Sequence, residues 1–374
     1  MGRAGLAHEA GRAGSRKRFS HTGFPDGTRK GEKMTYQEVL LQAQGKMGPC
    51  KVCPVCNGKA CRSTMPGPGA KGYGDTAIRN FEEWKKIRVN MDTICENFTP
   101  DTGFDFFGCH LKYPILAGPV GAVNLHYGDM LDDVAYNDIL VSGCAQAGIL
   151  ALTGDGTNPA VMKAACEAIG KIGGRAVPTV KPWDVNTLRE KFALIQSSGC
   201  FAVAMDIDAA GLPFLQNLNP PAGSKTVEEL REIIRSCGKP FIVKGIMTVK
   251  GARKALEAGA SAIIVSNHGG RVLDQCPSTA EMLPEIASAV GKDMMVLVDG
   301  GIRDGVDVFK ALALGADGVV AARPYVTAVY GGKQEGVKVL TEKLGKELAD
   351  TMKMCGTPDL ASITPDCVRR GSGS

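Results

Sequence analysis

The fold is decided by four short apolar runs in the second half of the chain: Pro240-Phe241-Ile242-Val243-Lys244, Ala262-Ile263-Ile264-Val265, Met294-Met295-Val296-Leu297-Val298 and Gly318-Val319-Val320-Ala321. Each run is apolar almost throughout, which is typical of strands that are buried on both faces of a parallel sheet. Amphipathic segments of helical length separate the runs. This stretch therefore predicts consecutive units of a strand followed by a helix.

The same alternation extends upstream to Tyr113 and gives eight such units over roughly 240 residues, the usual size of a (β/α)8 barrel. The predicted strands are residues 114–117, 148–152, 175–179, 202–207, 240–244, 262–265, 294–298 and 318–321. The predicted helices are residues 130–142, 159–172, 185–198, 227–237, 249–258, 279–290, 305–313 and 336–354. A doubly wound open sheet is the alternative, but no Gly-x-Gly-x-x-Gly follows the first strand. We predict the α/β class and a (β/α)8 barrel with an N-terminal extension.

Composition excludes several classes of function. The chain has 374 residues, 44% of them hydrophobic, and a net charge of +5. Residues 1–33 hold eight basic and three acidic side chains, so the excess belongs to this segment and the remainder is neutral. A neutral body argues against binding to nucleic acid. We find no run of 18 apolar residues that could span a membrane.

The composition also divides the chain into four parts. Residues 1–33 are rich in Gly, Arg and Ser, and we expect a disordered basic leader or an upstream mis-start. Residues 34–112 form an extension that carries a cysteine cluster, and a helix is expected to start near Thr35. Residues 113–356 form the barrel, and residues 357–374 form a tail. Most other cysteines stand singly in apolar stretches, which indicates a reducing compartment, the cytoplasm.

Charged residues follow the predicted strands at the end where barrels place their chemistry. After strands seven and eight, Gly300-Gly301 lets backbone N–H groups approach an anion, and Arg303 and Arg323 can clamp it. Two glycines alone would more often form a tight turn. Two arginines at matching strand ends favour a phosphate site.

Two further strand ends carry groups suited to proton transfer. Lys244 projects from a buried strand end and needs an anionic or electron-rich partner, either a flavin or a structural ion pair with Asp206 or Asp299. His268 lies on a glycine-rich loop, where it can act as a general base, with Asp208 as the carboxylate that orients it.

These residues resemble the FMN-dependent α-hydroxy-acid oxidase family, which includes glycolate oxidase and lactate oxidase. The matching segments are Ile242-Val243-Lys244-Gly245, Ser266-Asn267-His268-Gly269-Gly270-Arg271, Asp299-Gly300-Gly301-Ile302-Arg303 and Phe309-Lys310-Ala311-Leu312-Ala313-Leu314-Gly315-Ala316. A weaker similarity extends from about Ala77 to Gly356. The resemblance implies a (β/α)8 barrel, bound FMN, a homotetramer and oxidation of a 2-hydroxy acid to a 2-oxo acid, with an unidentified electron acceptor.

The resemblance also implies roles for the matched residues. His268 would take the hydroxyl proton, Asp208 would orient it, and Arg271 would bind the substrate carboxylate. Lys244 would contact the flavin N1–O2 edge. Further flavin contacts are expected at Pro119, Val120, Gly121, Thr153, Ser266, Asp299, Gly300, Gly301, Arg303, Ala322 and Arg323.

The sequence departs from the family on the substrate side. The family's N-terminal tyrosine has no counterpart, since Cys50–Gly69 occupies that region. A second tyrosine after strand three is replaced by Val180-Lys181, and a threonine at the end of strand four is replaced by Asp206. The loop after strand four, residues 209–213, lacks the family's second arginine. We therefore expect Arg271 to bind the carboxylate, with Lys181 as a substitute contact.

Four cysteines crowd into the extension: Cys50, Cys53, Cys56 and Cys61. Prolines and glycines around them indicate a loop. Four thiolates at this spacing suit a tetrahedral zinc ion or a [4Fe–4S] cluster. A zinc ion that only folds the segment is the structural alternative, and incidental thiols are the third.

Two other functions remain open on the sequence. One is an FMN-dependent isomerase of the type 2 isopentenyl-diphosphate isomerase kind. The other is a flavin or metal sensor without catalysis, which the missing tyrosines and arginine favour.

Overall fold

The computed structural model describes residues 33–371, apart from residues 213, 214, 216 and 218–221. The chain divides into Met1–Lys33 and Met34–Ser374. The predicted leader, residues 1–33, lies outside the described residues except for Lys33.

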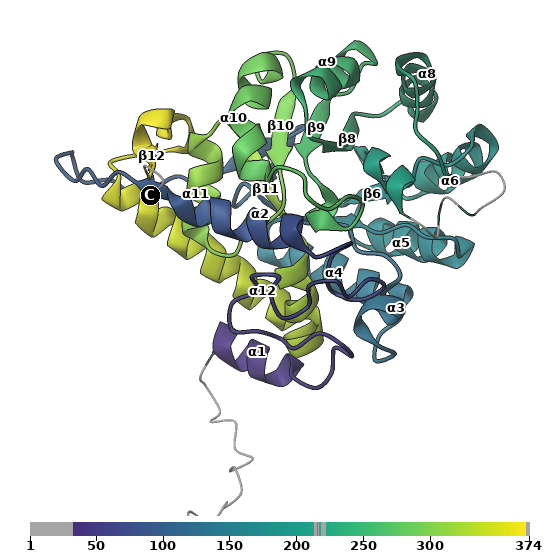
Figure 1. The fold of residues 1–374 in the computed structure, drawn as a ribbon, viewed down its shortest axis with the longest axis horizontal. Helices are drawn as coiled ribbons and strands as arrows, with labels where there is room; N and C mark the ends of the chain where they lie inside the picture. The colour runs from purple at the N-terminus through teal and green to yellow at the C-terminus, as the bar shows by residue number, and fades with distance from the viewer. Residues whose placement is uncertain (1–32, 213–214, 216, 218–221, 372–374) are drawn as a thin grey trace, which may run out of the picture. The chain divides into compact units, whose positions relative to one another are not determined.

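Eight parallel strands close into a barrel in the order of the sequence (Figure 1). Closure comes from the last strand pairing with the first, with Val319 opposite Ile115. The barrel strands are β4 (Ile115–Ala117), β5 (Leu150–Thr153), β6 (Val177–Val180), β7 (Val203–Asp206), β8 (Phe241–Ile246), β9 (Ala262–Val265), β10 (Met295–Val298) and β11 (Gly318–Ala321). The predicted (β/α)8 barrel is confirmed, and every predicted strand is present within about two residues of its expected ends.

Helices follow the strands and cover the outside of the barrel (Figure 1). They are α3 (Val123–Tyr127), α4 (Asp133–Ala147), α5 (Pro159–Lys171), α6 (Val185–Ser197), α8 (Val227–Cys237), α9 (Val249–Glu257), α10 (Thr279–Val290), α11 (Gly305–Ala313) and α12 (Arg323–Met354). Local sequence determines where several of these helices begin. Thr226 with Glu229, and Ser278 with Glu281, form reciprocal capping boxes at α8 and α10.

Three helix predictions need correction. The last helix begins at Arg323 instead of residue 336, because helix resumes beyond a single non-helical residue, Lys333, that follows two glycines. Pro324 sits at its first turn, where a missing N–H costs nothing. Helix α4 runs from Asp133, capped by Asp132, to Ala147 instead of over 130–142. The short helix α3 was not predicted.

The extension packs around the barrel with its own elements. Helix α1 (Tyr36–Ala43) begins at a capping box of Thr35 and Glu38, as expected, and α2 (Asp75–Lys86) follows the cysteine loop. Strands β2 (Phe104–Phe106) and β3 (Cys109–Leu111) form a hairpin. Phe104, Phe106 and Leu111 pack with the inward side chains of the barrel strands, so the hairpin fills one end of the barrel interior.

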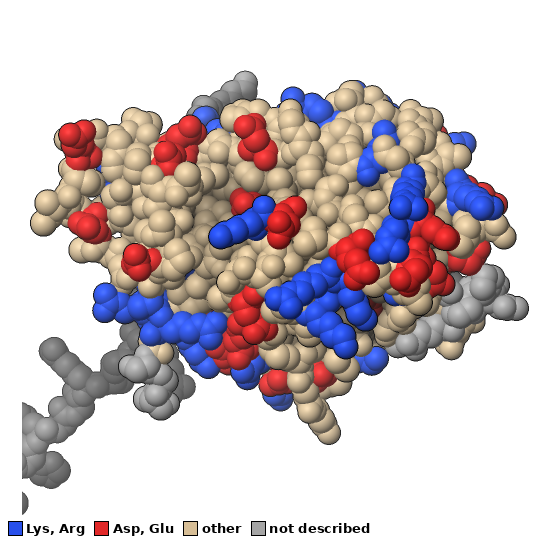
Figure 2. All heavy atoms as spheres, turned by 90° about the horizontal axis from the view of Figure 1, so that it is seen from above, with Lys and Arg blue, Asp and Glu red and all other residues tan. Residues whose placement is uncertain are grey.

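The C-terminal segment returns to the extension instead of ending as a free tail. Strand β12 (Val368–Arg370) pairs antiparallel with β1 (Ile87–Val89), the strand that follows α2. Within the described residues, no helix is long and apolar enough to cross a membrane. Basic and acidic side chains are interspersed on the face that Figure 2 shows.

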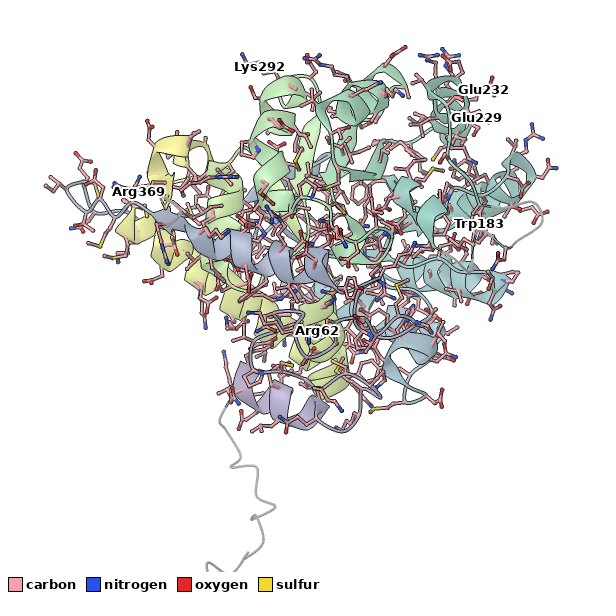
Figure 3. The ribbon with its side chains drawn as sticks, viewed as in Figure 1. Arg62, Trp183, Glu229, Glu232, Lys292 and Arg369 are labelled. Atoms are coloured by element: carbon pink, nitrogen blue, oxygen red, sulfur yellow. The ribbon has the colours of Figure 1, made fainter. Side chains whose placement is uncertain are left out.

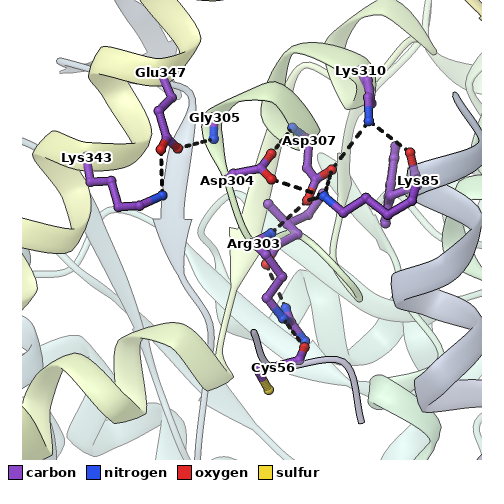
Figure 4. Close-up of polar contacts among 11 residues, drawn as sticks. Cys56, Lys85, Arg303, Asp304, Gly305, Asp307, Lys310, Lys343 and Glu347 are labelled. Atoms are coloured by element: carbon purple, nitrogen blue, oxygen red, sulfur yellow. Dashed lines mark hydrogen bonds and ion pairs between the residues drawn. The ribbon is translucent and has the colours of Figure 1, made fainter. Parts of the chain in front are cut away.

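Helix α2 is linked to α11 by a partly buried ionic cluster around Asp307 (Figure 4). Lys85 Nζ lies 2.7 Å from Asp307 Oδ1 and 3.0 Å from Asp304 Oδ2. Lys310 Nζ lies 3.7 Å from Asp307 Oδ1, and the Asp307 side chain is fully buried. Asp307 also accepts from the backbone N–H of Arg303 at 3.1 Å. One carboxylate thus connects two helices and the loop after β10.

We predict that Asp307→Ala lowers the free energy of unfolding by about 3–5 kcal/mol, because it removes a buried carboxylate from two ammonium groups. Urea unfolding followed by circular dichroism measures the change. Glu335→Ala, which removes an exposed ion pair with Lys338, should cost no more than about 1 kcal/mol. Equal losses in the two variants would contradict the role given to Asp307.

Candidate active site

A cavity of about 440 Å³ lies at the carboxyl end of the barrel strands. Every strand contributes to its wall through its last residues or the loop that follows it. One such residue from each strand, in chain order, is Gly118, Asp155, Lys181, Leu212, Lys244, His268, Asp299 and Ala321. Because all eight strands run in the same direction, residues far apart in the sequence meet at this one end.

The floor of the cavity carries a chain of buried charges. Asp206 and Lys244 are partners in the register of β7 and β8, and Lys244 Nζ lies 3.0 Å from Asp206 Oδ1. Lys181 Nζ lies 2.6 Å from the other oxygen of Asp206. Lys244 Nζ is also 3.8 Å from Asp299 Oδ2. Two ammonium groups therefore share one carboxylate, and Asp299 adds a second negative charge beside Lys244.

These contacts determine the charge states of Lys244 and of the carboxylates around it. Burial opposes the charge on Lys244, but Asp206, Asp208 and Asp299 outweigh it and raise its pKa above the ordinary value. Burial likewise opposes the charge on Asp206, yet Lys181 and Lys244 lower its pKa overall. Burial raises the pKa of Asp299 in spite of Lys244. Lys244 is thus a permanent cation facing the cavity.

His268 and Asp208 form the pair expected from the sequence. His268 Nδ1 lies 3.0 Å from Asp208 Oδ1 and 3.5 Å from Lys244 Nζ. Because the nearer neighbour of Nδ1 is the Asp208 carboxylate, an acceptor, we assign the proton to Nδ1, which donates to Asp208. Nε2 is then the basic nitrogen. Gly245, at a φ of +103°, permits this pairing, since a Cβ there would lie 2.5 Å from Asp208 Cβ.

Asp206, Asp208 and His268 also form the one group of three potential metal ligands in the described chain whose ligand atoms all lie within 4.8 Å of one another. Lys181 and Lys244 already neutralise Asp206. A divalent cation would meet two fixed ammonium charges there. The arrangement suits acid–base chemistry and not metal binding.

The opposite end of the cavity is built for an anion. Arg303, Arg323 and Gly301 line it after β10 and β11. Helix α12 starts there, and Ala322 at its N-cap provides no side-chain hydrogen bond, so the first N–H groups of a long helix lack a cap. Arg323 Nη2 donates to Gly269 O at 3.0 Å, and Arg303 Nε donates to Cys56 O at 2.7 Å (Figure 4).

Several buried polar atoms near the strand ends have no hydrogen-bond partner within the described chain. They are Asp299 Oδ1, Thr153 Oγ1, Thr179 Oγ1 and Asp208 Oδ2. Buried polar groups are normally paired, so these atoms indicate a polar ligand. Ser266, expected at the cofactor, instead donates to Asp299 Oδ2 at 2.8 Å and accepts from the His268 N–H. Pro119, Val120 and Gly121 line the cavity after β4.

Residues 66–74 of the extension cover the substrate side. Arg271 Nη1 donates to Gly67 O and Gly69 O, both at 2.9 Å, so part of its donor capacity is used within the protein. Asp274 accepts from the N–H groups of Tyr73, Gly74 and Thr76. The loop after β9 is thereby attached to the extension.

Two residues of the cavity wall, Asp155 and His126, are not predicted from the sequence. Asp155 accepts from Lys191 Nζ at 2.7 Å and from Trp183 Nε1 at 2.6 Å, and also from the backbone N–H of Lys181. Its position directly after a predicted strand could have marked it. His126, on α3, accepts from the Gly67 N–H through Nδ1 at 3.0 Å. Only the unpredicted helix α3 brings it to the site.

The four predicted metal ligands lie beside this site. Cys50, Cys53, Cys56 and Cys61 all line a second cavity of about 480 Å³. Tyr127, Arg303 and Arg323 line both cavities, so the two share a wall. All four cysteines are free thiols.

His126 predicts a pH dependence of stability. Burial, then Arg271, lowers its pKa from the ordinary 6.5 to about 3. Below pH 6.5 the imidazole of His126 is protonated in the unfolded chain but stays neutral in the folded chain. The free energy of unfolding therefore decreases as the pH falls from 6.5 towards 3. Between pH 7 and pH 5, His126 should lower the free energy of unfolding by about 2 kcal/mol.

The free energy of unfolding of wild type and His126→Gln, measured in urea at both pH values, checks this. The variant should lose less stability than wild type over the interval. An equal loss in both proteins would show that His126 is not the buried neutral group.

Curated relatives match part of the chain. An L-lactate dehydrogenase from Allorhizobium ampelinum is 42% identical over 156 residues, 42% of this chain and 40% of that protein. A peroxisomal (S)-2-hydroxyacid oxidase from Arabidopsis thaliana is 46% identical over 145 residues, 39% of each chain. The chain thus spans about two fifths of the length of these relatives.

Solved structures match over more of the chain. A mandelate oxidase variant with (S)-mandelic acid is 28% identical, with a TM-score of 0.68 over 79% of this chain and 90% of that one. A lactate oxidase from Pediococcus acidilactici shares the fold at 24% identity, with a TM-score of 0.72 over 91% of this chain and 96% of that one. The model of the FMN-dependent dehydrogenase family matches residues 68–218 and 213–370. The chain belongs to the FMN-dependent dehydrogenase family.

Proposed function

We propose that this protein binds FMN and oxidises a 2-hydroxy acid to a 2-oxo acid. The observation that carries the proposal is the contact of His268 with Asp208 and Lys244 in the cavity at the strand ends. The names of the L-lactate dehydrogenase and (S)-2-hydroxyacid oxidase relatives support the same reaction class.

The residues of the cavity fit FMN in three places. Arg303, Arg323 and the uncapped start of α12 supply positive charge for its phosphate. Asp299 Oδ1, in the cavity wall, lacks a partner and can accept from its ribityl hydroxyls; Thr153 Oγ1, at the end of β5 and outside the cavity lining, also lacks one. Lys244 places a fixed positive charge where the flavin ring would gain electrons. FMN, when bound, accepts a hydride from the substrate.

The chain's own residues then perform the proton chemistry. His268 Nε2 takes the proton of the substrate hydroxyl as a general base. Asp208, hydrogen-bonded to Nδ1, holds the ring in this tautomer and stabilises the imidazolium that forms. Gly245 keeps Asp208 close enough to do so.

The substrate carboxylate would bind at Arg271. Its Nη1 donates to Gly67 O and Gly69 O, and its Nη2 lies 3.1 Å from His126 Nε2, so a bound carboxylate would share the guanidinium with these contacts. Lys181 is fixed to Asp206 at 2.6 Å, so we propose that it contacts substrate only as part of that ion pair. Arg271 would then carry most of the carboxylate recognition.

The oligomeric state, the cellular location and the metal centre are part of the same proposal. We infer a homotetramer from the resemblance to the family, and a cytoplasmic location because the chain's thirteen cysteines are all free thiols. Cys50, Cys53, Cys56 and Cys61 would bind a metal centre, either a zinc ion or an iron–sulfur cluster.

We predict that His268→Ala keeps its flavin absorbance but is reduced about 10²–10⁴-fold more slowly by lactate or glycolate, because the general base is lost. Anaerobic stopped-flow bleaching of the flavin measures the rate. His110→Ala, at an exposed histidine, is the control and should match wild type. If no 2-hydroxy acid in a panel bleaches the wild-type flavin, the proposed function fails.

We predict that Arg323→Ala weakens FMN binding about 10–100-fold, because a charge-assisted contact to the phosphate is removed. Fluorescence titration of apoprotein with FMN gives the dissociation constant. Arg62→Ala, at an exposed arginine in the loop between α1 and α2 (Figure 3), should leave it unchanged. Unaltered FMN affinity in Arg323→Ala would overturn the phosphate assignment.

A further inference from the structure

The second cavity is shaped by the cysteine loop and has no role in the reaction described above. All four cysteines of the loop open onto its volume of about 480 Å³. The thiols are partly buried, between solvent and the flavin cavity. A segment that only needed to fold over the barrel would require neither four thiols nor a cavity between them.

A zinc ion and an iron–sulfur cluster hold their four cysteine sulfurs at different distances from one another. A zinc ion at about 2.3 Å from each sulfur holds four thiolates about 3.8 Å apart. In the described residues, no three cysteine sulfurs lie within 4.8 Å of one another. An iron–sulfur cluster places several iron and sulfide atoms between the thiolates and needs the wider spacing. The thiols are thus not gathered at the spacing of a single zinc ion, and a cavity lined by all four leaves room for a cluster.

The charge around the cavity matches a cluster that carries electrons. Residues 39–74 contain five basic side chains and no acidic one: Lys46, Lys51, Lys59, Arg62 and Lys71. Arg303, Arg323, Lys85 and Lys343 also line the cavity, with Asp304 as its one acidic lining residue, paired to Lys85. Positive surroundings stabilise the negative charge of a four-thiolate centre and of an added electron.

The two cavities are adjacent. Tyr127, Arg303 and Arg323 line both of them, and Arg303 Nε donates to the backbone carbonyl of Cys56 at 2.7 Å (Figure 4). One layer of side chains thus separates the thiols from the phosphate end of the flavin site. An electron would reach the thiols from the ring end of the flavin site, at Lys244, by way of its phosphate end.

We propose that Cys50, Cys53, Cys56 and Cys61 hold an iron–sulfur cluster through which electrons leave the flavin for an acidic one-electron carrier protein. The inference rests on the proposed function. The 2-hydroxy acid loses two electrons and two protons in forming the 2-oxo acid. The electrons pass singly through the cluster to two equivalents of oxidised carrier, and the two protons go to solvent.

The surface beside the thiols suits such a carrier. Lys46, Lys51 and Arg62 are exposed, as is the apolar side chain of Val55 between Cys53 and Cys56. A positive rim around an exposed apolar residue favours docking of an acidic partner.

The first test is chemical and does not depend on the substrate. Anaerobically purified protein should contain about four iron and four acid-labile sulfide per chain. Light with deazaflavin should reduce the centre and give an electron paramagnetic resonance signal at low temperature. Cys53→Ser should lose iron and signal, and Cys95→Ser, at an exposed cysteine outside the loop, should keep both. Zinc at one per chain, or no metal after anaerobic reconstitution with iron and sulfide, would overturn the proposal.

The second test follows the electrons. Cys53→Ser and Cys56→Ser should retain flavin bleaching by the hydroxy acid, which shows that they fold, and lose reduction of an acidic ferredoxin used as probe. Lys51→Glu should slow that reduction most at low salt. Ferredoxin reduction unchanged in the serine variants would overturn the electron route. Failure of the hydroxy acid to bleach wild type, with the light-induced signal intact, would instead overturn only the proposed substrate.

Discussion

The site depends on the burial of Lys244 between carboxylates at the end of β8. An ammonium group with 4% of its side chain exposed is stable only because Asp206 lies opposite it in the strand register and Asp299 lies on the far side. The same charge lies 3.5 Å from His268 Nδ1, the nitrogen that donates to Asp208, so Lys244 and the catalytic pair are in direct contact. Barrel closure thus determines the chemistry as well as the shape.

The floor of the cavity is held by connected ion pairs. Lys181 Nζ lies 2.6 Å and Lys244 Nζ 3.0 Å from the carboxylate of Asp206. Burying any of these charges without its partner would be costly. Lys191 and Trp183 extend the network through Asp155.

The extension is part of the site and not an appendage. Its loop gives two carbonyls to Arg271 and one N–H to His126, and its cysteines share a wall with the anion end of the cavity. The extension therefore contributes backbone contacts to the substrate side and a cysteine-lined cavity that we connect to electron transfer.

The sequence by itself determined the barrel, because short apolar strands and capped helices are local patterns that survive packing. It also determined which strand ends carry His268, Asp208, Lys244 and the two arginines. Only the tertiary structure decided how these charges pair. The sharing of Asp206 by two lysines, the use of Arg271 by the extension and the arrival of His126 on α3 depend on distances between segments far apart in the chain. No local pattern encodes those distances, since they arise only when the barrel closes and the extension packs across its end.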